Sequence, residues 1–176
     1  MKDFIKKNLA TLIVAGAGLL AFIFCLFLPG IIASNKYGAT KFSLINFMLG
    51  TGKYTNESTS GVIVKGSLDG GLSIFGLLSF ICLIAGIGLT IASIFVKDKK
   101  FDFIGSILIV VAGIFAFMLL VAGTDVTQKI GSQTVATSFS KTFQLFKLGA
   151  GAYVYGILAI LGGGFGIANK FLKIVK

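Results

Sequence analysis

The sequence predicts an all-α membrane protein, a bundle of four transmembrane helices with a small β-hairpin in the first extracellular loop. Of its 176 residues, 56% are hydrophobic and only 12% are charged, whereas soluble domains carry about 25% charged residues. Four stretches without Asp, Glu, Lys or Arg each exceed the about 20 residues that cross a bilayer as a helix. They predict one membrane domain, 1–176, with helices at about 8–33, 71–96, 103–123 and 149–169.

The first helix begins like a secretory signal peptide, because an apolar run follows Lys2, Lys6 and Lys7. A signal peptide has an apolar region of only about 7–15 residues and small side chains before its cleavage site. Here the run is longer, and the candidate exit GIIAS offers bulky isoleucines. A lipoprotein interpretation of Cys25 fails too, because phenylalanines precede it. We expect an uncleaved helix that Pro29, the only proline, ends or kinks.

The first outer loop, 34–70, is too long for a simple turn. Segments 40–48 and 60–66 contain β-branched and aromatic residues, and GTGKYTNESTS between them contains turn residues. We expect a small hairpin there, with 50–60 as its turn.

The second outer loop, 124–148, is rich in Ser and Thr before it becomes amphipathic. Phe139, Phe143 and Phe146 recur at helical spacing. Two interpretations stay open for this part. The phenylalanines belong either to a short helix in the membrane interface or to an early start of the fourth helix.

Lysines crowd at the N-terminus, between the second and third helices, and at the C-terminus, and they are sparser in the two long loops. The positive-inside rule puts both termini in the cytoplasm of a multi-pass plasma-membrane protein. We expect the following lysines to anchor to anionic lipid headgroups: Lys6, Lys7, Lys97, Lys99, Lys100, Lys170, Lys173 and Lys176. No basic cluster is interleaved with aromatic residues, so the net charge of +10 does not indicate nucleic-acid binding.

The fourth predicted helix carries small residues at alternating steps of three and four: Gly149, Ala152, Gly156, Ala159, Gly163 and Gly166. The third has a sparser stripe, Gly105, Ala112, Ala116 and Gly123, and the second has Ser79 and Gly86. In lipid, small residues let helix backbones approach closely. We expect a helix-packing seam and a homo-oligomer or a membrane-protein partner. In the alternative, the small-residue faces line a pore.

Catalytic chemistry has no candidate residues in this sequence. Histidine is absent, and the six acids lie in loops or at helix ends, whereas proton relays and intramembrane enzymes need ionisable groups within the span. The GGGFG stretch follows no strand and lacks the Lys-Ser/Thr ending of a phosphate loop. Cys25 and Cys82 fit as small packing residues. We expect no catalytic, cofactor-binding or metal-binding residues and no enzymatic activity.

Two motifs of the first loop, FLPG at 27–30 and KFSLINFMLG at 41–50, together with the four spans, carry a resemblance. The layout resembles small four-span proteins of low-GC bacteria and mollicutes and, more remotely, the claudin-type tetraspan topology. Claudins carry a Trp and two Cys in this loop, which this chain lacks, so none of their functional residues transfers.

The expected function is that of a non-enzymatic assembly, scaffold or accessory subunit, which acts through its glycine-rich seams and its extracellular loops. The alternatives are an oligomeric small channel and a membrane protein that gives immunity to a toxin.

Overall fold

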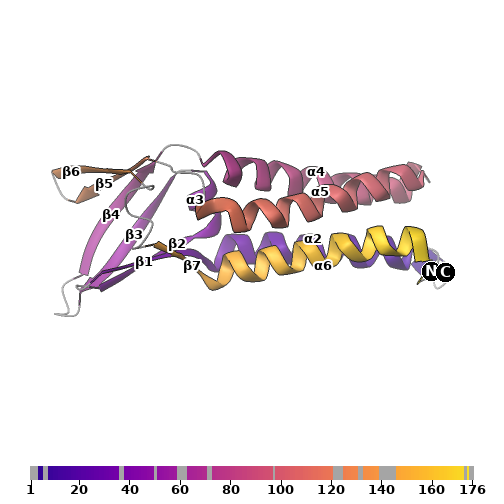
Figure 1. Cartoon of the computed structure of the whole chain (residues 1–176), viewed down its shortest axis with the longest axis horizontal. Coiled ribbons are helices and arrows are strands. Elements are labelled where there is room, and N and C mark those ends of the chain that lie inside the picture. The colour runs from indigo at the N-terminus through magenta and orange to yellow at the C-terminus, as the bar shows by residue number, and fades with distance from the viewer. Residues whose placement is uncertain are drawn as a thin grey trace. The chain divides into compact units, whose positions relative to one another are not determined.

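The structure is a computed structural model of the whole chain (Figure 1). It describes residues 4–5, 8–35, 38–49, 51–58, 63–70, 73–96, 98–120, 125–130, 133–138, 146–172 and 174. The chain divides into two compact units. The helical unit comprises 1–23, 78–115 and 155–176, and the sheet unit comprises 24–77 and 116–154. Each of the four long helices begins in one unit and ends in the other.

Four helices are long and apolar enough to cross a membrane: α2 (Leu9–Phe27), α4 (Ile74–Val96), α5 (Lys99–Phe117) and α6 (Ala150–Leu172). This confirms a helix of spanning length and apolarity at each of the four predicted places, as expected of a multi-pass membrane protein. A 3-10 turn, η1 (Met118–Leu120), follows α5.

The helix ends differ from the prediction for local reasons. α2 stops at Phe27 instead of about 33, because Pro29 has no backbone N–H to donate and the chain turns into a strand there. α5 starts at Lys99 instead of 103, because the Asp98 carboxylate accepts a hydrogen bond from the Lys100 backbone N–H at 2.8 Å. The α4 start is capped similarly by Ser73, whose hydroxyl accepts from the Gly76 N–H at 3.2 Å. The first turn of α5 contains charged residues, so a search for stretches without charge places the start of this helix too late.

Within the helical unit, contacts define the order of the helices around the bundle. Phe22 of α2 lies near Phe80 of α4, with ring centroids 6.2 Å apart. A methyl group added at Gly86 of α4 would lie 2.9 Å from the Gly105 carbonyl oxygen of α5. The α5–α6 and α6–α2 contacts, described below, complete a ring in the order α2, α4, α5 and α6.

The helical unit buries small residues together with a few large ones, such as Leu83, Ile109 and Tyr155, and exposes many large apolar side chains. Its buried positions include Val14, Ala21, Ala112 and Ala159. Large side chains point outward on every helix, and Leu161 of α6 is 66% exposed. A soluble bundle would bury those side chains. This distribution fits a hydrocarbon surrounding, in which association depends on close packing.

The sheet unit contains one seven-stranded antiparallel sheet in the order β6-β5-β4-β3-β2-β1-β7. Its strands are β1 (Pro29–Asn35), β2 (Gly38–Ser43), β3 (Thr51–Ser58), β4 (Ile63–Gly70), β5 (Asp125–Ile130), β6 (Gln133–Ser138) and β7 (Phe146–Leu148). A short helix, α3 (Leu44–Met48), interrupts the path from β2 to β3.

The four predicted helices are present, but the sheet is larger than the one small hairpin that was predicted beside them. Segment 44–48, predicted as strand, is helical, because the Ser43 hydroxyl accepts from the Asn46 N–H at 3.4 Å and caps a helix. Most of the predicted turn 50–60 is strand β3, which pairs with β2 and β4 on its two sides. Two-sided backbone pairing outweighs the weak strand propensity of its Gly, Asn and Ser residues.

The second predicted loop also contributes strands. β5 pairs with β4, and β7 pairs with β1, so segments 34–70 and 124–148 form one sheet. Phe146 lies in β7 opposite Ala33, and α6 begins only at Ala150, so the fourth helix does not start early at Phe146. Phe139 and Phe143 lie outside the described residues.

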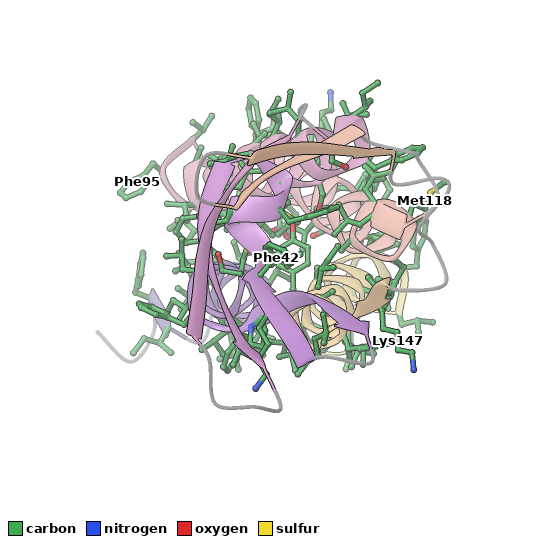
Figure 2. The ribbon with its side chains drawn as sticks, turned by 90° about the vertical axis from the view of Figure 1, so that its left-hand side faces the viewer. Phe42, Phe95, Met118 and Lys147 are labelled. Carbon is green, nitrogen blue, oxygen red and sulfur yellow. The ribbon has the colours of Figure 1, made fainter. Side chains whose placement is uncertain are left out.

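The core of the sheet unit forms where α3 meets β1 and the end of α2. Ile31, Leu44 and Met48 are fully buried. The Cys25 thiol lies 3.8 Å from the Met48 sulfur. Figure 2 shows Phe42 on the inner side of the curved sheet and Lys147 pointing away from it.

Candidate functional site

The predicted seam of α6 is buried along its whole length. All six of its small residues are buried: Gly149, Ala152, Gly156, Ala159, Gly163 and Gly166. Because they recur every three or four residues, they occupy one face of the helix. That face is therefore covered by other parts of the same chain.

In the helical unit, the seam of α6 lies against α5. A methyl group added at Gly163 would lie 2.5 Å from the Ser106 carbonyl oxygen and 2.8 Å from a Val110 methyl carbon. From the other side, a methyl group added at Gly113 would lie 2.8 Å from the Gly156 carbonyl oxygen. Real β-carbons do not approach backbone oxygens this closely, so the two helices meet backbone to backbone.

The same helix also touches α2 within this unit. An added methyl group at Gly162 would overlap the β-carbon of Ala17, and one at Gly166 would overlap the Ser106 hydroxyl oxygen and lie 2.8 Å from a Val14 methyl carbon. By contrast, a methyl group at Gly164 would meet nothing within 4 Å. The glycines of α6 thus divide into a covered set and one open position.

In the sheet unit, the start of α6 is fixed to the turn that follows α2. The Gly149 N–H donates to the Gly30 carbonyl at 2.7 Å. A side chain at Gly149 would overlap the Pro29 carbonyl, and a methyl group at Gly151 would lie 2.8 Å from the Leu28 carbonyl oxygen. Glycine at both positions lets the α6 backbone lie directly against this turn.

The predicted small-residue stripe of α5 faces α4, and it does not face the seam of α6. Gly105, Ala112 and Ala116 are buried, and Gly123 lies outside the described residues. A methyl group at Gly105 would lie 2.7 Å from the Gly86 carbonyl oxygen of α4. The α5 residues that meet the seam are Ser106, Val110 and Gly113. The sequence analysis did not select these three residues, although a glycine within a membrane helix, such as Gly113, indicates a possible close helix contact.

A buried hydroxyl network joins three helices of the helical unit. The Ser79 hydroxyl of α4 donates to the Ala112 carbonyl of α5 at 2.7 Å and lies 2.9 Å from the Tyr155 hydroxyl of α6. The Tyr155 hydroxyl also lies 3.3 Å from the Ser79 carbonyl, to which it can donate. Both side chains are fully buried. The network positions polar atoms among apolar helices without any charge, which suits a structural role.

We expect Tyr155→Phe to lower the free energy of unfolding by about 0.6–1.7 kcal/mol, the range for hydrogen bonds between membrane helices. The cost stays small because Ser79 keeps its bond to the Ala112 carbonyl. The measurement is thermal unfolding of the protein in detergent. Tyr153→Phe is the matched control, because the Tyr153 side chain is 49% exposed. Equal losses in the two variants would contradict a specific role for the network.

Three of the predicted headgroup anchors are described, and all three are exposed: Lys99, Lys100 and Lys170. The Lys170 Nζ lies 3.6 Å from the centre of the Phe103 ring, and Phe171 contacts that ring edge-on at 6.1 Å between centroids. The remaining anchors, Lys6, Lys7, Lys97, Lys173 and Lys176, lie outside the residues whose side chains are described.

Asp102 is the acid in the first turn of α5. Its carboxylate hydrogen-bonds Thr11 of α2 and lies near Lys99. Its Oδ1 atom is buried and has no hydrogen-bond partner among the described residues. The Ser106 hydroxyl donates to the Asp102 backbone carbonyl at 2.8 Å. Since the carboxylate is only partly buried, it does not by itself form a site.

No group of three or more His, Cys, Asp or Glu residues in the described parts of the chain is arranged to hold a metal ion. No protein-family model matches the chain, and no curated protein matches it. The resemblance to four-span bacterial proteins therefore stays a prediction.

Proposed function

We propose that the protein is a non-enzymatic accessory or assembly subunit of a bacterial plasma membrane, with both termini in the cytoplasm and the sheet outside. The observation that carries the proposal is that the glycine seam of α6 is occupied within one chain. Gly163 lies against Ser106, and Gly149 lies against Pro29. The seam thus supports the bundle itself, which leaves the sheet as the element that meets a partner.

The same observation weighs against the pore alternative. A pore lined by the small-residue face would need Gly156 and Gly163 to face an open lumen, whereas both are buried. Glycines with open space next to them, Gly16, Gly88 and Gly164, are scattered over α2, α4 and α6. They offer positions where another membrane helix could approach closely.

The test is purification of the full chain from its native membrane in mild detergent, followed by reconstitution into liposomes. We expect a stoichiometric complex with a second membrane or surface protein, and no ion flux above that of empty liposomes. Ion flux above that of empty liposomes would favour the pore alternative. Recovery of a secreted toxin as the bound partner would favour the immunity alternative.

The proposed orientation predicts a labelling pattern. In intact cells, a membrane-impermeant amine reagent should modify the exposed Lys41 and Lys147 of the sheet unit and leave Lys99 and Lys100 unmodified. Modification is mapped by mass spectrometry of peptides. Permeabilised cells are the control, in which all four lysines should react. Modification of Lys99 in sealed cells would reverse the orientation.

A further inference from the structure

The lysines of the sheet lie in two neighbouring rows that cross the strands. In the first row, Lys129 of β5 is opposite Ser67 of β4, which is opposite Lys53 of β3. In the second, Lys65 of β4 is opposite Thr55 of β3. Lys41 of β2 lies level with Thr55, because the preceding residue, Thr40, pairs with Asn56.

The second row continues to the far edge of the sheet. Lys41 is opposite Ile32 of β1, and Ile32 is opposite Lys147 of β7. Across the sheet, in the order β5, β4, β3, β2, β1 and β7, each strand except β1 carries one lysine in these rows. We call this set the lysine band: Lys41, Lys53, Lys65, Lys129 and Lys147.

The whole band belongs to one face of the sheet. Residues directly opposite each other in an antiparallel ladder share a face, and successive residues alternate between faces. Lys41 and Lys147 are exposed. The next residue in each strand, Phe42 after Lys41 and Leu148 after Lys147, pairs with Ile31 and lies on the other face of the sheet. Phe42 is only 3% exposed there. In Figure 2, Phe42 lies inside the curve of the sheet and Lys147 points outward.

Two acids of this face lie in the rows next to the two lysine rows, where Asp69 is diagonal to Lys53 and Lys129 and Glu57 is diagonal to Lys65. Asp69 is opposite Thr51 and Thr127, Asp125 is opposite Ser138, and Glu57 is opposite Ala39 and Ile63. Strands are about 4.8 Å apart and same-face neighbours along a strand about 7 Å apart. Lysine positions on adjacent strands are thus about 8 Å apart, and the band extends about 24 Å across the sheet.

We propose that the lysine band binds a linear phosphate polymer that lies across the strands. A row of single cationic positions matches an extended chain of anions better than a broad acidic protein surface. Ser67 and Thr55, between the lysine positions, are residue types whose hydroxyls donate to phosphate oxygens. The two rows contain no aromatic residue among the described strands, so stacking on nucleic-acid bases does not contribute. The inference does not depend on the proposed orientation or partner.

The probe is fluorescently labelled inorganic polyphosphate long enough to follow the band, added to the full-length protein in an uncharged detergent. Binding is measured by anisotropy over a series of salt concentrations. If five lysines each neutralise one phosphate, the slope of log affinity against log salt should be about −3.5. A triple variant, Lys53→Gln/Lys65→Gln/Lys129→Gln, should bind at least about tenfold more weakly, with a slope near about −1.4.

Two controls separate the band from general positive charge. Lys99→Gln/Lys100→Gln, at the start of α5, should bind like the unmodified protein, and the triple Lys→Arg variant should retain binding. Thermal unfolding of each variant verifies the fold. The proposal is overturned if the triple Gln variant binds as tightly as the unmodified chain while folded. It is overturned equally if orthophosphate competes as well as the polymer at the same phosphate concentration, or if anionic-lipid vesicles bind in a band-dependent manner and the polymer does not.

Discussion

Replacing Gly163 with leucine is expected to lower the thermal unfolding midpoint of the detergent-solubilised protein by about 6–12 °C. Even the first carbon of the new side chain would lie 2.5 Å from the Ser106 carbonyl oxygen, which belongs to the backbone and cannot rotate away. The α5 and α6 helices must separate to accommodate it. Overpacking typically costs about 1–3 kcal/mol, and we expect the upper limit because leucine adds three more carbons beyond the first one. A cost of about 3 kcal/mol corresponds to a shift of about 6–12 °C for a chain of this size.

Gly164→Leu is the matched control for this prediction. Its position is one residue further along α6, so the change in helix propensity is the same, but a methyl group there meets nothing within 4 Å. We expect its midpoint to match or exceed that of the unmodified protein. If the two variants unfold at the same temperature, the α5–α6 contact is not the close approach that Gly163 requires.

Gly30→Ala is expected to destabilise the sheet unit by about 1–3 kcal/mol or more. The added methyl group would lie 2.5 Å from both the α-carbon and the β-carbon of Leu44, at the start of α3. Leu44 is fully buried, so it has no space into which to move. A shift of β1 would also disturb the Gly30 carbonyl, which accepts the Gly149 N–H at 2.7 Å.

Limited proteolysis and thermal unfolding measure this effect together. Gly30→Ala should expose the segments 34–70 and 124–148 to protease at temperatures at which the unmodified protein resists. Lys147→Ala, an exposed change in the same sheet, should stay within about 0.5 kcal/mol of the unmodified protein. Protection of Gly30→Ala equal to that of Lys147→Ala would show that β1 and α3 can separate without cost.

Sequence reasoning found the four helices because length and apolarity decide a membrane span. It named Pro29 as the residue that ends or kinks the first helix but still extended that helix to about 33. It missed the start of α5, because the Asp98 cap acts through a backbone hydrogen bond that hydropathy does not register. It also missed β3, whose TGKYTNES sequence resembles a turn. The predicted strands 40–48 and 60–66 overlap β2 and β4, but they were expected to pair with each other, whereas each of them pairs with β3.

The small residues of α6 could be selected from their spacing, but their partners on α5 could not. A repeat of three and four residues defines a face of one helix, while the neighbour of that face depends on the order of helices around the bundle. In this chain α5 lies between α4 and α6, so Gly105 meets Gly86 and Thr90, whereas Gly113 meets Gly156. The Ser79–Tyr155 contact could not be predicted either, because the two residues are 76 positions apart in the sequence and belong to different helices.

The sheet has a consequence for biosynthesis, because its outer pairs join segments made at different times. β1 to β4 are synthesised before α4, but β4 pairs with β5 and β1 pairs with β7, both of which follow α5. At a synthesis rate of about 5–20 residues per second, the interval from Gly70 to Leu148 lasts about 4–16 s. During that interval two more helices must enter the membrane while the first four strands wait with two unpaired edges. Such edges are templates for aggregation, so the nascent chain should depend on a holding chaperone on the side of the membrane where the strands emerge.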